Sequence, residues 1–571
     1  MTAAQTVPPA PPLRTWQRRA LSAYLLRRPA DFLAVATPGA GKTTFALRVA
    51  AELLADRTAA AVTVVTPTEH LKTQWAAAAA ALGIPLDPTF RNADGATARD
   101  FRGAVVTYAQ VAAAPALHRA RTAARRTLVV LDEVHHAGDA LSWGDAVRES
   151  FAPAARRLAL TGTPFRSDEN AIPFVRYEPE PDGALRSVAD HAYGYGEALR
   201  DGVVRPVIFL AYSGEARWRT RAGEELSARL GEPGTAEHVA RAWRTALDPA
   251  GDWVPAVLAA ADQRLSQVRS GGMPDAGGLV IASDQAAARA YAARLREITG
   301  APPVVVLSDD RGASARIAEF AASSARWMVA VRMVSEGVDV PRLAVGVYAT
   351  SASTPLFFAQ AVGRFVRARR PGETASVFLP SVPPLLRLAG ELEAVRDHVL
   401  GRRRTDEDGG WDDDLLAAAQ ARRDEPGEDE RAFTALGASA HLDQVIFDGA
   451  SFGTGATPGT AEEEDYLGLP GLLEPDQVAL LLRQRQAKQV AEEKRRGPAP
   501  APTRSAGPVP AHERRSALRR QLNALVAAHH HRTGRPHGTI HSELRRACGG
   551  PPTAVASVEE LEQRIATLQS W

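Results

Sequence analysis

The chain has 571 residues, of which 45% are hydrophobic and 23% charged, and its formal net charge is +2. This length predicts several domains, and this composition is typical of a globular protein. A nearly neutral chain can bind nucleic acid only through local basic patches. The single cysteine, Cys548, excludes internal disulfides and four-cysteine metal sites and favours a reducing cytoplasm. No apolar run reaches eighteen residues and residues 1–12 lack the order of a signal peptide, so we expect no membrane span.

The first chemically informative segment is a strand, a glycine turn and a helix. Residues 32–36 form an apolar run, Pro38-Gly39-Ala40-Gly41 form the turn, and Lys42-Thr43-Thr44 open a helical pattern. The amides of such a turn and the helix N-terminus favour a phosphate. Lys42 can then reach the β- and γ-phosphates of ATP, and the Thr43 hydroxyl can ligate Mg²⁺. The segment fits the pattern G-x-x-x-x-G-K-[ST] except for Ala36 at the first glycine, and the alternative is a chance glycine turn.

Two carboxylates follow the apolar run 127–131, which predicts a buried parallel strand. Ligands bind at the carboxyl edge of such sheets. There Asp132 can hold Mg²⁺ through water, and Glu133 can orient and deprotonate the attacking water. The alternative is that the pair only caps a helix.

Three further strand patterns end in polar turns, and a second α/β unit follows. The turns bring Thr66, Thr68 and Lys72 after residues 61–65, Thr107 and Tyr108 after 103–106, and Thr161 and Thr163 after 158–160. Residues 213–275 carry a helical pattern, and the apolar run 278–282 opens the second unit. Residues 402–460 combine dense mixed charge with glycine-rich stretches, which predicts solvated surface or disorder.

These segments resemble, in order and spacing, the motifs of superfamily-2 helicases and translocases of the DExH type. The resemblance runs from Gln17 to Arg367, about three-fifths of the chain, and the box reads Asp-Glu-Val-His from residue 132. The length, this box and the histidine-rich tail also resemble the actinobacterial SftH-type clade of DNA-dependent ATPases. The family implies an α/β fold of two tandem RecA-like lobes, each a parallel sheet flanked by helices, with a mostly helical C-terminal extension. The expected units are lobe 1 (1–212), a helical connection (213–275), lobe 2 (276–400), a charged and Gly/Pro-rich extension with linker (401–510) and a small helical module (511–571).

The resemblance also implies a role for each matching residue. Gln17 would recognise adenine, Gly337 and Asp339 would contact the ribose and the cleft, and Thr161 and Thr163 would couple hydrolysis to lobe movement. Thr66, Thr68, Lys72, Thr107 and Tyr108 would contact the nucleic acid. Residues 358–367 match Q-x-x-G-R-x-x-R. On one helix Gln360, Arg364 and Arg367 would share a face, from which the guanidiniums can neutralise the γ-phosphate. The alternative for that face is a solvated basic helix.

The function that the family implies is an ATP- and Mg²⁺-dependent motor, a monomeric 3′-to-5′ DNA translocase with helicase activity. We expect it in the cytoplasm, associated with the nucleoid when bound to DNA. Three alternatives stay open: a duplex translocase that never separates strands, an RNA helicase, and an ATP-gated scaffold that binds nucleic acid without moving.

The tail admits two interpretations. His529-His530-His531, His537, His541 and Cys548 could supply zinc ligands, but no C-x-x-C pair is present. The spacing favours a basic turn leading into a short helix that ends at Gly549. A last helix is expected after a capping box formed by Ser557 and Glu560.

Overall fold

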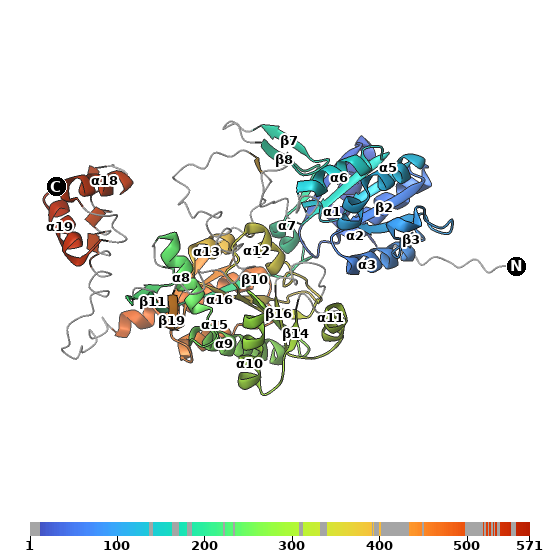
Figure 1. Cartoon of the computed structure of the whole chain (residues 1–571). Coiled ribbons are helices and arrows are strands. Elements are labelled where there is room, and N and C mark those ends of the chain that lie inside the picture. The colour runs from blue at the N-terminus through green and yellow to red at the C-terminus, as the bar shows by residue number, and fades with distance from the viewer. Residues whose placement is uncertain are drawn as a thin grey trace.

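The structure is a computed structural model. It describes residues 12–135, 141–162, 171–179, 185–220, 223–231, 235–307, 312–331, 340–390, 392, 399–400, 433–447, 450–496, parts of 518–533, 537–549 and 556–571. Within these residues the chain forms two α/β lobes followed by a small separate helical cluster (Figure 1). No helix in this part of the chain is long and apolar enough to cross a membrane.

Lobe 1 is built on a seven-stranded, wholly parallel sheet. Its strands are β1 (Asp31–Ala36), β2 (Ala61–Thr66), β3 (Leu86–Asp87), β4 (Gly103–Thr107), β5 (Thr127–Leu131), β6 (Arg156–Thr161) and β9 (His191–Tyr193). They lie in the order β3-β4-β2-β5-β6-β1-β9. The helices are α1 (Thr15–Arg27), α2 (Lys42–Ala55), α3 (Glu69–Ala81), α4 (Tyr108–Ala113), α5 (Pro115–Ala124), α6 (Leu141–Phe151) and α7 (Tyr195–Arg200), with a short 3₁₀ turn at Asn92–Asp94.

Helices cover both faces of this sheet, which explains why its strands are continuous apolar runs. Phe32 and Ala34 of β1 belong to the buried cluster that includes residues of α1, α2 and α3. Leu33 and Val35 face the other way and pack with residues of α4 and α6. The predicted strands of lobe 1 are therefore confirmed, and their carboxyl ends meet along one edge of the sheet.

Lobe 2 has an eight-stranded sheet with six parallel strands and an antiparallel edge. The strands are β10 (Val207–Ser213), β13 (Gly277–Ala282), β14 (Val304–Val306), β15 (Trp327–Val331), β16 (Leu343–Ala349), β17 (Ala375–Pro380), β20 (His441–Phe447) and β21 (Ala450–Ala456). Their order is β14-β15-β13-β16-β17-β10-β20-β21, with β20 and β21 antiparallel to their neighbours. Helices α9 (Trp253–Ser270), α10 (Gln285–Thr299), α11 (Ala313–Ala322), α12 (Pro355–Val362) and α13 (Pro383–Gly390) belong to this lobe. The prediction of two RecA-like lobes is confirmed.

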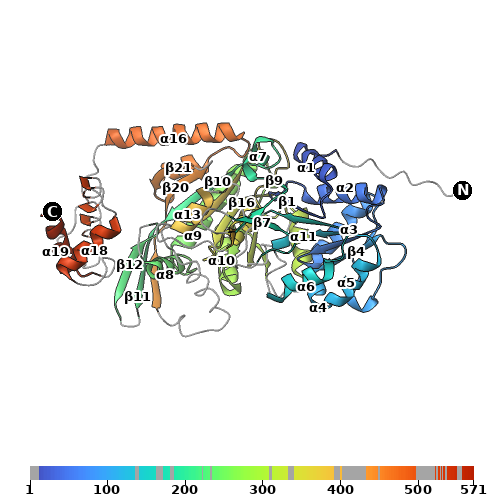
Figure 2. The ribbon, with the colours of Figure 1, turned by 90° about the horizontal axis from the view of Figure 1, so that it is seen from above.

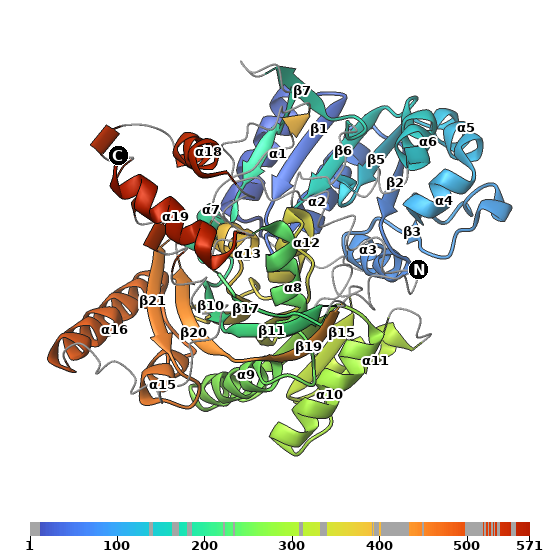
Figure 3. The same cartoon turned by 60° about the vertical axis from the view of Figure 1, so that its left-hand side comes forward.

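Two predictions about the segments around lobe 2 are wrong. The connection 213–275 is not wholly helical, because β11 (Glu215–Thr220) and β12 (Glu225–Arg229) precede its helices α8 (Ala236–Ala246) and α9. β11 also pairs with β19 (Phe433–Ala438), giving a small sheet of order β12-β11-β19 beside α8 (Figure 3). In addition, β10 lies in the second sheet, so lobe 2 begins before residue 212.

The glycine-rich stretch after residue 432 is also more ordered than predicted. It forms β19, β20 and β21, and the last two extend the second sheet. Helices α15 (Ala461–Leu467) and α16 (Pro475–Arg496) follow, and Figure 2 shows α16 as a long single helix along lobe 2. A third small sheet combines β7 (Arg176–Pro179), β8 (Leu185–Val188) and β18 (Val399–Leu400).

The tail has a hydrophobic cluster of its own, as its sequence pattern predicts. Helices α18 (His537–Cys548) and α19 (Val558–Gln569) bury Leu544 and Leu561 together with Leu522. The capping box of Ser557 and Glu560 is present, and Gly549 ends α18 with a φ of 71°. His530 and His531 lie outside the described residues, and within the described ones no three His, Cys, Asp or Glu side chains are grouped as metal ligands.

Candidate functional site

The phosphate loop has the predicted geometry. β1 ends at Ala36, and α2 begins at Lys42 after a turn in which Gly39 and Gly41 have φ angles of 80° and 91°. These left-handed conformations favour glycine. A Cβ atom on Gly41 would also lie 2.8 Å from Nε2 of Gln17. The turn therefore needs glycine both for its backbone and for the close approach of α1.

Side chains at the start of α1 hold the carbonyls of this loop. Arg14 Nη1 donates to Gly39 O at 2.8 Å, and Trp16 Nε1 donates to Ala40 O at 3.0 Å. Gln17 Nε2 donates to Gly41 O at 2.9 Å, while its Oε1 accepts from the backbone N–H of Arg14. Three consecutive loop carbonyls are thus fixed from one element. The sequence analysis missed Arg14 and Trp16, and the structure gives the buried Gln17 amide a loop-holding role beside the predicted adenine contact.

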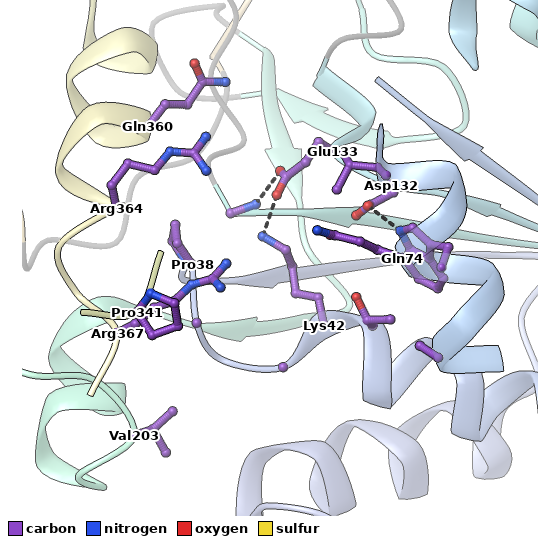
Figure 4. Close-up of a pocket in the computed structure, with 18 of the residues that line it drawn as sticks. Pro38, Lys42, Gln74, Asp132, Glu133, Val203, Pro341, Gln360, Arg364 and Arg367 are labelled. Atoms are coloured by element: carbon purple, nitrogen blue, oxygen red, sulfur yellow. Dashed lines mark hydrogen bonds and ion pairs between the residues drawn. The ribbon is translucent and has the colours of Figure 1, made fainter. Parts of the chain in front are cut away.

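Lys42 and Glu133 face each other across the loop (Figure 4). Lys42 Nζ lies 2.8 Å from Glu133 Oε1 and donates to Ala36 O at 3.3 Å. The other carboxylate oxygen of Glu133 accepts from the backbone N–H of Gly162 at 3.1 Å. Glu133 also has a φ of 45°, a strained conformation for a non-glycine residue and one that concentrates at functional sites.

The electrostatics keep Glu133 ionised. Burial acts to raise the pKa of this carboxyl, but the Lys42 ammonium and His135 outweigh burial and lower the pKa below its ordinary value. Burial, followed by the neighbouring Glu133 charge, raises the pKa of Asp132. The pKa values of the two adjacent carboxyls are therefore driven apart, that of Glu133 downward and that of Asp132 upward.

Asp132 is held by two buried aromatic side chains. Its Oδ2 accepts from Trp75 Nε1 at 2.7 Å, and its backbone carbonyl accepts from the Tyr108 hydroxyl at 2.9 Å. Its backbone N–H donates to Val65 O at 2.9 Å, which continues the pairing of β5 with β2. Trp75 is a site residue that the sequence analysis missed.

A chain of polar contacts runs from the carboxylates of lobe 1 to α12 of lobe 2. His135 Nδ1 lies 2.9 Å from Thr161 Oγ1 and 3.7 Å from Glu133 Oε2. On its other side, His135 Nε2 lies 3.4 Å from Gln360 Nε2. The predicted coupling residue Thr161 and the predicted cleft residue Gln360 are thus connected through one buried histidine.

The prediction that Arg364 and Arg367 lie on one helix is wrong, but both arginines do lie in the cleft. α12 ends at Val362, so Arg364 lies in the turn that follows and Arg367 forms a bridge with Val204. The residue after the helix is Gly363, where a Cβ atom would lie 2.8 Å from Pro38 of the phosphate loop. Gly363 therefore lets lobe 2 approach the loop, and both arginines still reach the same pocket. Burial lowers the pKa of Arg367 to about 10, which leaves it charged at neutral pH.

These groups line one pocket between the lobes, with a volume of about 550 Å³. This volume lies in the range of small-molecule and cofactor sites. Ten of the predicted site residues line it, and Figure 4 shows the lobe 1 and lobe 2 side chains facing each other. The ten are Pro38, Gly39, Gly41, Lys42, Thr43, Asp132, Glu133, Gln360, Arg364 and Arg367. Gln17, Ala40 and Thr44 belong to the loop or its support but do not line the pocket.

The oxygen groups of this pocket fit a Mg²⁺ ion. Thr43, Asp132 and Glu133 line the pocket together, and the Asp132 side chain is buried with one oxygen already bonded to Trp75. Mg²⁺ prefers oxygen ligands, and in nucleotide sites it takes one or two carboxylates and completes its shell with phosphates and water. Thr43 and Asp132 are the residues that would hold it.

Most of the predicted nucleic-acid contacts are buried inside lobe 1. The Thr66 hydroxyl donates to Thr68 O, Lys72 pairs with Gln110 and Glu69, and Thr107 caps α4. The Tyr108 hydroxyl donates to the Asp132 carbonyl, and all four side chains are buried, so their contact with nucleic acid stays a prediction. Thr68, at the N-terminus of α3, is partly exposed. Thr163, Gly337 and Asp339 lie outside the described residues.

The chain is similar to known proteins in its first lobe and over its whole length. Residues 11–166 match the family model described as the type III restriction enzyme res subunit. Among solved structures, S. cerevisiae Dbp5 bound to RNA and ADP BeF3 is 13% identical, with a TM-score of 0.44 over 71% of this chain and 93% of that one. The type ISP restriction-modification enzyme LlaBIII bound to DNA is 14% identical, with a TM-score of 0.45 over 94% of this chain and 36% of that one. The family match therefore covers most of lobe 1.

Whole-chain relatives define the family more closely. The chain is 62% identical over 562 residues to the uncharacterized protein Rv2917 of Mycobacterium tuberculosis (strain ATCC 25618 / H37Rv), covering 98% of this chain and 92% of that protein. It is 60% identical over 563 residues to the uncharacterized protein ML1624 of Mycobacterium leprae (strain TN), covering 98% and 94%. The chain belongs to the family of these mycobacterial proteins.

Proposed function

We propose that this protein is a nucleic-acid-dependent ATPase that moves along DNA in the 3′-to-5′ direction and separates its strands. The observation that carries the proposal is the division of the pocket between two lobes. Lys42 and Glu133 come from lobe 1, whereas Arg364 and Arg367 come from lobe 2. Because the groups needed for hydrolysis lie on separate lobes, ATP turnover requires the lobes to approach each other, and their relative movement can do work.

In the proposed reaction the loop amides and Lys42 bind the phosphates of ATP. A phosphate in the pocket competes with Glu133 for the Lys42 ammonium, which frees the ionised carboxylate to orient the attacking water and accept its proton. Arg364 and Arg367 neutralise charge on the γ-phosphoryl group. Thr43 and Asp132 would hold Mg²⁺, which would supply positive charge to neutralise the phosphates.

The contact between His135 and Gln360 offers a route by which hydrolysis changes the cleft. His135 touches Thr161 and Gln360 and lies within 4 Å of Glu133. A change in the Glu133 environment therefore reaches α12 through a single side chain. We propose that this contact makes and breaks as the lobes close and open.

The direction of movement, the choice of DNA and the monomeric state rest on the resemblance to SftH-type ATPases, and the cytoplasmic location rests on the single cysteine. The match of residues 11–166 to a restriction-enzyme res subunit supports a motor of this kind. We expect the nucleic acid to lie across both lobes and to be held through its backbone, so that binding depends strongly on salt and little on sequence.

The deciding experiment measures the ATPase rate with single-stranded DNA, duplex DNA and RNA, beside strand displacement from substrates with 3′ or 5′ tails. We expect stimulation by DNA and displacement only from the 3′-tailed substrate. Stimulation by RNA alone would replace the proposal with an RNA helicase. Stimulation by duplex DNA with triplex displacement but no strand separation would indicate a duplex translocase. No turnover with any nucleic acid would leave only an ATP-gated scaffold.

The substitution Glu133→Gln tests the assignment of the base. The amide keeps the shape of the side chain but cannot accept the proton of the water, so we expect hydrolysis to fall at least ~10²-fold. Binding of ATP and DNA should persist, because Lys42 and the loop amides remain. Loss of ATP binding in this variant would show that Glu133 belongs to the metal site instead.

A further inference from the structure

Trp75 holds one oxygen of the carboxylate that faces the nucleotide pocket. It lies on α3 with only 2% of its surface exposed, and its indole N–H donates to Asp132 Oδ2 at 2.7 Å. The carboxylate is itself buried, with 7% of Asp132 exposed. Hydrogen bonds to charged groups contribute more to stability than hydrogen bonds between neutral groups. Burial adds to this, because little water is available to take the place of a lost donor.

The main chain of Asp132 is held by hydrogen bonds, so rotation of its side chain is the freedom that Trp75 can limit. The backbone N–H bonds to Val65 O, and the backbone carbonyl accepts from the Tyr108 hydroxyl. With the main chain held at both ends, the carboxylate can still rotate about its side-chain bonds. The bond to Oδ2 limits that rotation while Asp132 still lines the pocket beside Thr43.

The indole ring is held firmly enough to act as this constraint. Trp75 belongs to the buried cluster between the first sheet and its helices, together with neighbouring Ala76 and Ala79 of α3. Trp75 is also one of the residues that line the pocket. Phenylalanine would fill most of the same space, but it has no donor at this position.

We propose that Trp75 is a positioning residue that aims the Asp132 carboxylate for Mg²⁺–nucleotide binding. The inference rests on the proposed function, because it assigns Asp132 to the metal. Groups that hydrogen-bond to a metal-binding side chain typically change metal affinity by about 10- to 100-fold when they are removed. Loss of the indole donor should therefore weaken the Mg²⁺-dependent part of nucleotide binding and leave the metal-free part unchanged.

The test measures the affinity of a fluorescent ADP analogue for the full chain, in EDTA and over a series of Mg²⁺ concentrations. In Trp75→Phe we expect the Mg²⁺ concentration at half-saturation to rise ~10-fold or more, with unchanged affinity in EDTA. Trp253→Phe is the matched control. Trp253 is equally buried, but its indole N–H has no hydrogen-bond partner among the described residues, so the Mg²⁺ dependence should not move.

A second variant separates the lost hydrogen bond from altered packing. Replacing Trp75 with 3-benzothienylalanine substitutes sulfur for the ring N–H and keeps the shape of the indole. This variant should show the same rise in Mg²⁺ requirement, and it decides the question if Trp75→Phe fails to fold. An unchanged Mg²⁺ requirement in the benzothienyl variant would overturn the inference, as would an equal loss of affinity with and without Mg²⁺. A wild-type protein whose nucleotide binding ignores Mg²⁺ would instead overturn the metal assignment in the proposed function.

Discussion

Replacing Lys42 with alanine is expected to abolish ATP hydrolysis while the fold is retained. The ammonium lies at the first residue of α2, lines the pocket, and is only 11% exposed. Its removal takes away the charge that contacts the transferred phosphoryl group. Lys72 of the neighbouring helix α3 cannot replace it, because its ammonium is buried and already paired with Glu69 and Gln110. ATPase rate with saturating DNA is the measurement.

The same substitution leaves Glu133 without its closest cation, so a stability change must be separated from a catalytic one. We expect a lowered melting temperature in Lys42→Ala and partial recovery in the double variant Lys42→Ala/Glu133→Gln, which removes both charges. Neither variant should hydrolyse ATP. Lys488→Ala is the matched control, because Lys488 of α16 forms a 2.9 Å pair with Asp465 of α15 in which both side chains are at least half exposed. Near-wild-type turnover in Lys42→Ala would contradict the assignment of the whole pocket.

The elements that the sequence predicts well are those defined by local pattern. The strand before the phosphate loop, the strand before Asp132 and the capped helix at Ser557 each depend on a few consecutive residues. A buried parallel strand is apolar on both faces, and a cap is a short-range hydrogen bond, so neither needs knowledge of the rest of the chain. The predicted site at the carboxyl edge of lobe 1 follows from the same local signals.

The parts that the sequence did not reveal depend on contacts between distant residues. β11 pairs with β19 more than two hundred residues later, and its alternating polar pattern is short enough to be hidden within a helical stretch. Trp75 reaches Asp132 across 57 positions, and nothing in its own neighbourhood marks it as more than a core residue. The end of α12 likewise depends on Pro38, against which Gly363 packs. The only hints of these long-range contacts in the sequence were an isolated tryptophan and a glycine inside a helical pattern. Both are weak indications.

Arg364→Ala and Arg367→Ala are each expected to reduce ATP turnover about 10³-fold or more, since arginines that neutralise the γ-phosphoryl charge have effects of this size. Both line the pocket from lobe 2, opposite Lys42 and Glu133. For Arg364→Ala the effect should fall on the turnover number, with nucleotide affinity changed much less, because this guanidinium acts when the lobes close. Single-turnover hydrolysis and nucleotide binding measured on the same preparations distinguish the two quantities.

The structure predicts a difference between the two arginines. Arg367 also packs against the phosphate loop, where a Cβ atom on Gly39 would lie 3.1 Å from its Cγ, whereas Arg364 lies in the turn beyond α12. Arg367→Ala should therefore weaken nucleotide binding as well as turnover, and Arg367→Lys should restore the packing without the planar fork of donors. Arg387→Ala, at an exposed position on α13, is the control and should leave both quantities unchanged. If Arg364→Ala hydrolyses ATP at the wild-type rate, Arg364 is a surface or interlobe residue, and lobe 2 contributes to catalysis through Arg367 alone.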